Sequence, residues 1–168
     1  AMEADASGVF SNSAYSASIG AGIGVGVEFV QDNESYSKEA YTVRGLHYQS
    51  PPHAQDKLVR VVKGRILDVV VDIRTRSNSY GKWTSAELSA DNGKQLFVPK
   101  GFLHGFMTLE PDTIVAYKVT NFYDGPSDGA VFWASESLGI DWPVAVGKAV
   151  LSDKDAAAPP FEAFRSPF

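Results

Sequence analysis

The sequence predicts an all-β fold, a sandwich or barrel of the jelly-roll kind, formed as one domain over residues 1–168. Short runs of alternating apolar and polar residues recur at close spacing, and clusters of Gly, Pro, Asn or Asp separate them. Helical periodicity is scarce, and neither an internal repeat nor a linker divides the chain. A chain of 168 residues is also long enough to bury one hydrophobic core.

The chain begins with an atypical segment, residues 1–26, that is rich in Ser, Ala and Gly. Closely spaced glycines at its end weaken any strand or helix there, so we assign no element to it. After this segment the two-residue alternation of apolar side chains predicts a series of short strands. These strands cover residues 28–31, 42–48, 58–63, 65–73, 83–88, 95–98, 105–109, 114–119 and 130–133.

The alternation is clearest in the strand over residues 65–73. One face holds Leu67, Val69, Val71 and Ile73. The other face carries Asp68 and Asp72 among its apolar residues, so it is partly polar. Lys63-Gly64, just before this strand, predicts a hairpin turn to the preceding one.

Composition and charge limit the classes of function. Hydrophobic residues make up 44% and charged residues 21% of the chain, which is usual for globular proteins. A net charge of -5 and a pI near 5.1 argue against nucleic-acid binding, so an anionic ligand has to meet a local basic cluster. The chain has no cysteine, which excludes disulfides and thiolate chemistry. Without a signal-like start or a long apolar run, we expect a soluble, cytoplasmic protein with no membrane segment.

The chain has three histidines, and they differ in their surroundings. His47 lies among the polar side chains of residues 44–49, and Lys57 follows on the next predicted strand. An imidazole and an ammonium on neighbouring strands suit proton removal beside a carbonyl. From the residues alone the role of His47 stays open between catalysis and structure. His53 lies in a polar loop and is expected at the surface, and His104 follows a Gly-containing turn.

Two other kinds of site are disfavoured. The chain has no His-x-His pair, and its scattered histidines have no carboxylate at a short interval, so no metal site is expected. It also lacks the Gly-x-Ser-x-Gly pattern that presents the nucleophile in many Ser-His-Asp hydrolases.

Several motifs follow one another along most of the chain. The motif Arg-Gly-Leu-His-Tyr-Gln at residues 44–49 and the tail Leu-Ser-Asp-Lys-Asp at residues 151–155 are the most distinctive. In this order the chain resembles the dTDP-4-dehydrorhamnose 3,5-epimerases, a sugar-nucleotide family with a cupin-like jelly-roll barrel and short flanking helices. The resemblance covers residues 29–33, 43–49, 57–60, 68–74, 80–83, 99–108, 117–118, 139–143 and 151–159.

The resemblance implies an isomerase that uses no cofactor and inverts C3 and C5 of dTDP-4-dehydro-6-deoxy-D-glucose, forming dTDP-4-dehydro-L-rhamnose. Both carbons flank the C4 ketone, so loss of either proton leaves an enolate with its charge on O4. By family position, His47 is the base and Asp155 is its partner. Lys57 matches a lysine near the ketone oxygen, and Tyr117 matches a tyrosine that donates a proton from the opposite face of the sugar.

The resemblance also implies substrate-binding residues and a partner. Arg44 and Lys154 match basic residues that face the diphosphate or the sugar. His104 matches a histidine that contacts the sugar. The positions that meet the nucleotide or line the rest of the pocket are matched by Gln31, Asp32, Asn33, Tyr123 and Asp128. The implied partners are the dTDP-sugar substrate and a second copy of the chain in a homodimer.

The match fails in the first segment, where the family has the pattern Asp-x-Arg-Gly-x-Phe-x-Glu. Ser7 stands in place of the arginine and Asn12 in place of the glutamate. Both changes remove charge, so the preference for a nucleotide base is open, and we expect reduced or absent exchange of an amino-terminal strand between subunits. Two alternatives stay open: an epimerase that inverts only C3 or only C5 of a related nucleotide sugar, and a noncatalytic nucleotide-sugar-binding protein.

Overall fold

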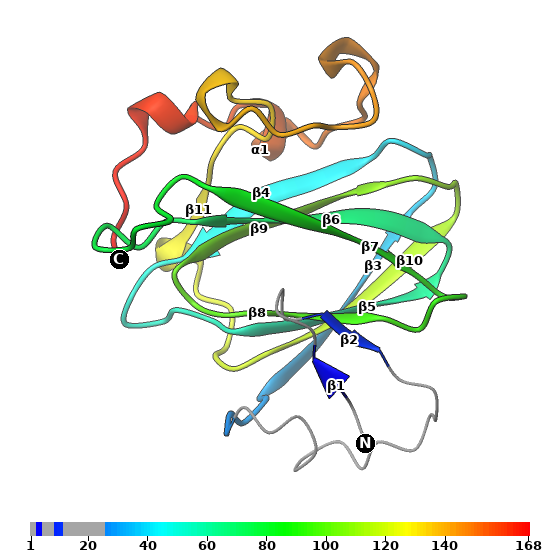
Figure 1. Cartoon of the computed structure of the whole chain (residues 1–168), viewed down its shortest axis with the longest axis horizontal. Helices are drawn as coiled ribbons and strands as arrows, with labels where there is room; N and C mark the ends of the chain where they lie inside the picture. The colour runs from blue at the N-terminus through cyan, green and yellow to red at the C-terminus, as the bar shows by residue number, and fades with distance from the viewer. Residues whose placement is uncertain (1–2, 5–8, 12–25) are drawn as a thin grey trace.

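The chain folds into two antiparallel β-sheets, which confirms the expected all-β architecture (Figure 1). The computed structural model describes residues 3–4, 9–11 and 26–168. The six-stranded sheet has the order β1 (Glu3–Ala4), β2 (Val9–Ser11), β8 (Gln95–Val98), β5 (Lys57–Lys63), β10 (Thr113–Val119) and β3 (Gln31–Ser37). The five-stranded sheet has the order β11 (Asp128–Ala130), β4 (Val43–Gln49), β9 (Phe102–Thr108), β6 (Arg65–Asp72) and β7 (Trp83–Ser89).

The helices are short and lie late in the described chain. They are η1 (Gly125–Ser127), η2 (Glu136–Leu138), η3 (Val146–Lys148), α1 (Asp153–Ala156) and η4 (Phe161–Ala163). All but α1 are 3-10 turns. α1 begins at a Ser152 cap, whose hydroxyl accepts a hydrogen bond from the Asp155 amide.

The space between the sheets holds one of two apolar clusters. In β6, Ile66 and Val70 point into this space and pack in the same cluster as Val59 of β5 and Val115 of β10. Asp68 lies on the same face of β6, so the face is partly polar, as the alternation predicts. The inner cluster fills one part of the sandwich and leaves polar side chains to line the rest.

The second cluster covers the other face of the five-stranded sheet. Val69, Val71 and Ile73 pack here together with Trp133 and Phe164, which come from the carboxyl-terminal segment, residues 131–168. Figure 1 shows this segment, in orange and red, lying over the sheet that contains β4, β9 and β6. The predicted apolar face of β6 is therefore buried against a chain segment and not against the opposite sheet.

A bulge in β4 interrupts its pairing with β9. Arg44 pairs with Phe106 and His47 with His104, so β4 has one residue more than β9 over this stretch. The extra residue reverses the alternation, and both Arg44 and His47 face the six-stranded sheet although they are three positions apart. The two strands approach closely at Gly45, where a Cβ atom would lie 2.6 Å from the Gly105 Cα atom.

Most strand predictions are confirmed to within a few residues, and two are displaced. The predicted hairpin at Lys63-Gly64 is wrong, because the strands on its two sides, β5 and β6, lie in different sheets. The expected strand at 28–31 is found as β3, which begins only at Gln31, and the expected strand at 130–133 is found as β11, which ends at Ala130. β3 is the edge of its sheet, with alternate residues exposed, so its apolar content is too low to mark it. Residues 131–133 leave the sheet to begin the outer cluster.

Candidate active site

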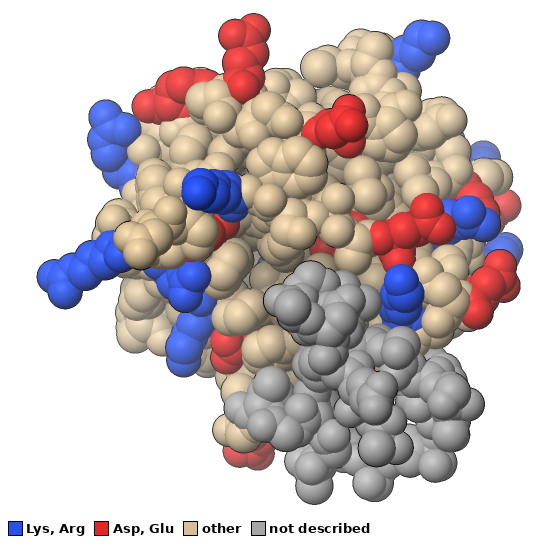
Figure 2. Space-filling view, in the orientation of Figure 1, with Lys and Arg blue, Asp and Glu red and all other residues tan. Residues whose placement is uncertain are grey.

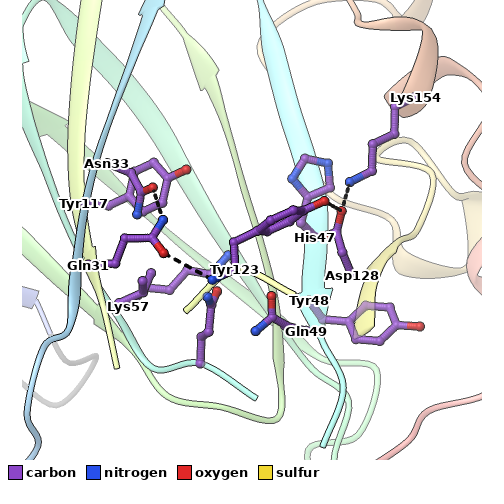
Figure 3. A pocket seen from close by; sticks show the side chains of 12 residues that line it. Gln31, Asn33, His47, Tyr48, Gln49, Lys57, Tyr117, Tyr123, Asp128 and Lys154 are labelled. Atoms are coloured by element: carbon purple, nitrogen blue, oxygen red, sulfur yellow. Dashed lines mark hydrogen bonds and ion pairs between the residues drawn. The ribbon is translucent and has the colours of Figure 1, made fainter. Parts of the chain in front are cut away.

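A cavity of about 420 Å³ opens between the two sheets (Figure 3). Its walls come from β3, β4, β5, β10, β11, α1 and the loops beside them. The lining residues are Gln31, Asn33, His47, Tyr48, Gln49, Gln55, Lys57, Tyr117, Val119, Tyr123, Asp128 and Lys154. Eight of the predicted site residues are among them, so the fold brings together residues that lie far apart in the described chain. Those eight are Gln31, Asn33, His47, Lys57, Tyr117, Tyr123, Asp128 and Lys154.

His47 is joined to a buried carboxylate behind the cavity wall. Its Nε2 atom lies 2.6 Å from Asp155 Oδ1, and the side chain of His47 is 29% exposed against 4% for Asp155. The second carboxylate oxygen, Oδ2, accepts a hydrogen bond of 2.8 Å from the Ser152 hydroxyl. Burial alone would raise the pKa of Asp155, but the hydrogen bonds from His47, Ser152 and the Gly45 amide hold it below its usual value. Asp155 therefore stays ionised at neutral pH and orients the imidazole.

Tyr117 and Lys57 stand on the opposite sheet from His47. They occupy neighbouring strands, since Val119 of β10 pairs with Lys57 of β5. Burial raises the pKa of the Tyr117 phenol, with Asp128 adding to the effect and Arg44 opposing it. The phenol therefore keeps its proton at neutral pH. Figure 3 shows the His47 and Tyr117 rings on two sides of the same cavity.

Lys57 brings an ammonium into a confined space. Burial lowers its pKa to about 8, although Asp128 and Asp68 favour its charged form. Within the residues that the structure describes, no ion pair occupies this ammonium. Lys57 is therefore available to an anionic or carbonyl oxygen of a bound ligand.

A hydrogen-bonded chain of side chains crosses the mouth of the cavity. Gln31 Nε2 donates to Asn33 Oδ1 at 2.6 Å, and Gln31 Oε1 accepts from the Tyr123 amide at 3.1 Å. The Tyr123 hydroxyl donates to Asp128 Oδ2 at 3.2 Å, and Lys154 forms an ion pair with the same oxygen. The ring of Tyr123 lies across the opening in Figure 3, and the residue is 63% exposed. Amides, an aromatic ring and a cation thus meet at this end of the cavity.

Three of the expected binding residues do not line the cavity. Asp32 points to the other face of β3 and pairs with Lys118, so its side chain lies away from the site. The Arg44 side chain is tied to β3 through the Ser37 hydroxyl and the Tyr36 carbonyl. The outward direction of Asp32 follows from the alternation of β3, in which Asp32 lies between two residues that do line the cavity.

His104 is the third of these residues. It is 7% exposed and its Nε2 atom lies 2.9 and 3.0 Å from the two oxygens of Asp68. It pairs with His47 across β4 and β9, and paired residues point to the same face of a sheet, so its side chain lies on the inner face beside the cavity without lining it. His53 is exposed, as its polar loop predicts.

Four lining residues were not predicted: Tyr48, Gln49, Gln55 and Val119. The signal for Gln49 was present, because it lies two positions after His47 on the same face of β4. Gln55 lies in a loop before β5 and has no periodic signal. Ser7 and Asn12, the two departures from the family pattern, lie outside the described residues.

Two features are absent from the part of the chain that the structure describes. No three side chains of His, Asp or Glu gather there in a way that could hold a metal ion. None of its helices combines the length and apolar content that a membrane crossing requires.

Comparisons with known proteins agree on one family. The family model described as dTDP-4-dehydrorhamnose 3,5-epimerase matches residues 1–163. The dTDP-4-dehydrorhamnose 3,5-epimerase of Sinorhizobium fredii is 53% identical over 133 residues, which cover 79% of this chain and 68% of that protein. The Salmonella typhimurium enzyme of the same name is 49% identical over 82% of this chain and 74% of that protein.

Solved structures share the fold. The crystal structure of the Bacillus anthracis dTDP-4-dehydrorhamnose 3,5-epimerase, with TDP and PPi bound, has a TM-score of 0.79 and 52% identity over 82% of this chain and 78% of that one. The dTDP-6-deoxy-D-glucose-3,5-epimerase of Legionella pneumophila, in complex with dTDP-4-keto-L-rhamnose, has a TM-score of 0.79 and 42% identity. The match covers 85% of this chain and 74% of that one. The two-sheet architecture is therefore the cupin-like jelly roll of these proteins.

Proposed function

The chain belongs to the dTDP-4-dehydrorhamnose 3,5-epimerase family, and on this premise we propose that it inverts C3 and C5 of dTDP-4-dehydro-6-deoxy-D-glucose to form dTDP-4-dehydro-L-rhamnose. One observation carries the proposal: an imidazole and a phenol line the same cavity from opposite sheets, at His47 and Tyr117. Inversion at a carbon requires removal of a proton from one side and its return from the other, and this pair suits both steps.

His47 is the base in this proposal. The ring nitrogen that does not face Asp155 takes the proton from the carbon beside the ketone, and the ring becomes an imidazolium. Asp155 stabilises that charge, because its carboxylate is ionised and lies 2.6 Å from the other ring nitrogen. The burial of Asp155 supports this role, because the attraction between the carboxylate and the imidazolium is stronger there than in water.

Lys57 and Tyr117 complete the reaction. As the proton leaves, negative charge develops on the C4 oxygen, and the Lys57 ammonium stabilises the enolate in a site that is partly shielded from water. Tyr117 then donates its proton to the carbon from the face opposite to His47. Its raised pKa supports this role, since the phenol is protonated before the transfer. The ketone lets the same groups act at C3 and at C5, once His47 has released its proton to the solvent and Tyr117 has taken one up.

The nucleotide end of the substrate binds at the mouth of the cavity. We assign Gln31, Asn33, Tyr123, Asp128 and Lys154 to it, because they line this end and offer donors, acceptors and an aromatic ring. The Lys154 ammonium lines this end of the cavity and can attract a diphosphate. The Legionella pneumophila and Bacillus anthracis relatives are solved with a dTDP-sugar and with TDP and PPi, respectively, which supports this class of ligand.

Incubation with dTDP-4-dehydro-6-deoxy-D-glucose in heavy water tests the reaction. Proton removal and return exchange hydrogen with the solvent, so NMR should show deuterium at both C3 and C5. Label at C3 alone would indicate a 3-epimerase, as in the 3'-monoepimerase of Streptomyces bikiniensis, which is 31% identical. Label at neither carbon, with dTDP-sugar binding still seen by calorimetry, would leave the noncatalytic binding protein as the function.

Variants of the two central residues test the mechanism in the same assay. His47→Ala and Tyr117→Phe should each lower turnover by about a hundredfold or more, the usual contribution of a general base or acid. Lys118→Met is a matched control, because this lysine lies on the other face of β10 and pairs with Asp32. Turnover close to wild type in either of the first two variants would remove that residue from the mechanism.

Assembly, domain organisation and location are further parts of the proposal. We expect residues 1–168 to act as one domain in a cytoplasmic homodimer; the edge strand β3, unpaired on one side in the described residues, gives a second copy a place to bind. Nucleic acid is not an expected partner, because the net charge is -5 and the face in Figure 2 carries acidic as well as basic side chains. Light scattering that gives only the monomer mass at several concentrations would reject the dimer.

A further inference from the structure

The four residues 121–124 are attached to the sheets by glutamine side chains. Gln55 Nε2 donates to the Asn121 carbonyl at 2.8 Å, and Gln49 Nε2 donates to the Phe122 carbonyl at 3.0 Å. The Tyr123 amide donates to Gln31 Oε1 at 3.1 Å, and the Asp124 amide donates to Gln49 Oε1 at 3.0 Å. Within the described residues, no backbone hydrogen bond ties residues 121–123 to a strand. The position of this segment therefore depends on amide side chains.

Gln49 is the central support of the segment. It is 6% exposed, and both polar atoms of its amide are used. Besides Phe122, its Nε2 atom donates to the His53 carbonyl, so it also fixes the loop between β4 and β5. A flip of this buried amide would place Nε2 against the Asp124 amide and Oε1 against two carbonyl oxygens, so the amide can adopt one orientation only. Gln31 and Gln55 are more exposed and hold one backbone group each.

The segment carries Tyr123, whose ring lies across the cavity mouth. The ring itself is largely exposed, and its hydroxyl has a hydrogen bond to Asp128 at 3.2 Å. Packing therefore does little to hold it, and its place is set by the backbone beneath it. No hydrogen bond or ion pair that the structure shows for Gln49 involves His47, Asp155, Lys57 or Tyr117.

We propose that Gln49 is a positioning residue for substrate affinity: it holds residues 121–124 so that Tyr123 stands over the cavity, and it takes no part in proton transfer. The inference rests on the proposed function and extends it from the residues that touch the nucleotide sugar to one that acts through them. It predicts a change in KM without a matching change in kcat, since the base, the acid and Lys57 keep their places.

Gln49→Met keeps the length of the side chain and removes its hydrogen bonds. KM for the dTDP-sugar should rise about tenfold, as loss of these hydrogen bonds loosens the segment, while kcat stays within about twofold. The dissociation constant of dTDP, measured by calorimetry, should rise by the same factor. Gln95→Met is the matched control, because Gln95 lies in β8 outside the cavity, and it should change neither constant.

A double variant separates positioning from a general loss of structure. If Gln49 acts through Tyr123, Gln49→Met should raise KM by less than about twofold when Tyr123 is already Ala, because the two changes then remove the same interaction. An equal rise in both backgrounds, or a fall in kcat with KM unchanged, would overturn the inference. Gln49→Glu, which keeps one acceptor and loses both donors, is the second variant if Gln49→Met does not fold.

One readout does not depend on the enzyme activity. Amide hydrogen exchange at Asp124 should be faster in Gln49→Met than in the wild type, because its amide loses the Gln49 Oε1 acceptor. Exchange at Tyr123, whose amide keeps its bond to Gln31 Oε1, should rise only as the whole segment loosens. If the wild type turns over no dTDP-sugar, the proposed function fails, and the exchange rates still decide the inference. Equal rates in the two proteins would show that Gln49 does not hold the segment.

Discussion

Lys57, which stabilises the enolate in the proposed mechanism, has an unusually low pKa. Burial lowers its pKa to about 8, so the ammonium loses its proton as the pH rises through that value. Only the charged form can stabilise an enolate, so kcat/KM should fall as the pH rises above about 8. The measurement is the pH profile of kcat/KM, which reports the free enzyme.

Lys57→Arg gives the control for this assignment. A guanidinium keeps its charge at every pH in the assay, so the fall on the alkaline side should move upward or disappear, even if the rate itself is lower. An unchanged alkaline limb in Lys57→Arg would assign the titration to another group.

The Ser152 hydroxyl helps to keep the pKa of Asp155 low. Burial raises the pKa of Asp155, and the hydrogen bonds that lower it include the one from the Ser152 hydroxyl. Because the folded pKa is depressed, Asp155 adds stability above its unfolded pKa, and that stability is lost as the pH falls through the folded pKa. Ser152→Ala should raise the folded pKa, lower stability by about 1 kcal/mol at neutral pH through loss of the cap, and move the acid loss to higher pH.

Urea unfolding between about pH 3 and pH 7 measures this effect. Ser152→Thr keeps the hydroxyl and should follow the wild-type curve. Parallel curves for Ser152→Ala and the wild type would mean that the hydroxyl caps α1 without influencing the carboxylate.

At the scale of the elements, the bulge in β4 sets the spacing of the site. Gly45 has a φ of 130° and approaches β9 so closely that a Cβ atom would lie 2.8 Å from the His104 carbonyl oxygen. Gly45→Ala should cost about 2 to 4 kcal/mol in the free energy of unfolding, through both strain and overlap. It should also lower activity, because His47 follows two positions later. The matched control is Gly147→Ala, since nothing lies within 4 Å of a Cβ atom there; similar losses in both variants would contradict the role of the bulge.

The strands show which features of the fold can be predicted from sequence patterns. In β6 the alternation predicted both faces correctly, since each face packs against an apolar cluster. β3 was placed too early, because an edge strand that faces solvent on one side and a polar cavity on the other has no apolar alternation. The bulge at Gly45 could not be predicted, because a regular pleat places Arg44 and His47 on opposite faces and only pairing with β9 shows the extra residue.

At the scale of the molecule, the site depends on contacts between distant parts of the chain. The resemblance named eight of the twelve residues that line the cavity, but it could not show that Asp32 points outward or that His104 is buried against Asp68. Motifs give the residues and their order, whereas the direction of each side chain depends on register and packing. Gln49 could be assigned to the cavity from its position two residues after His47, but its bonds to residues 121–124 could not be predicted, because its partners there are backbone groups that carry no sequence signal.

The carboxyl-terminal segment is the part of the molecule that supports His47, the proposed base. It carries Asp155, and it is held to the five-stranded sheet by the outer cluster, in which Phe164 is 7% exposed and its ring centroid lies 5.4 Å from that of Tyr48. This cluster is separate from the one between the sheets. The segment can therefore loosen while the sheets stay folded, as cooperative units of unequal stability do.

Phe164→Ala tests this separation. The change should remove about 3 to 5 kcal/mol of packing from the outer cluster only, so enzyme activity should disappear at a lower urea concentration than the far-ultraviolet circular dichroism of the strands. Val115→Ala, in the cluster between the sheets, is the control, and it should lose activity and strand signal together. Coincident transitions in Phe164→Ala would mean that the segment and the sheets unfold as one unit, and Asp155 would then be as firmly placed as the strand that carries His47.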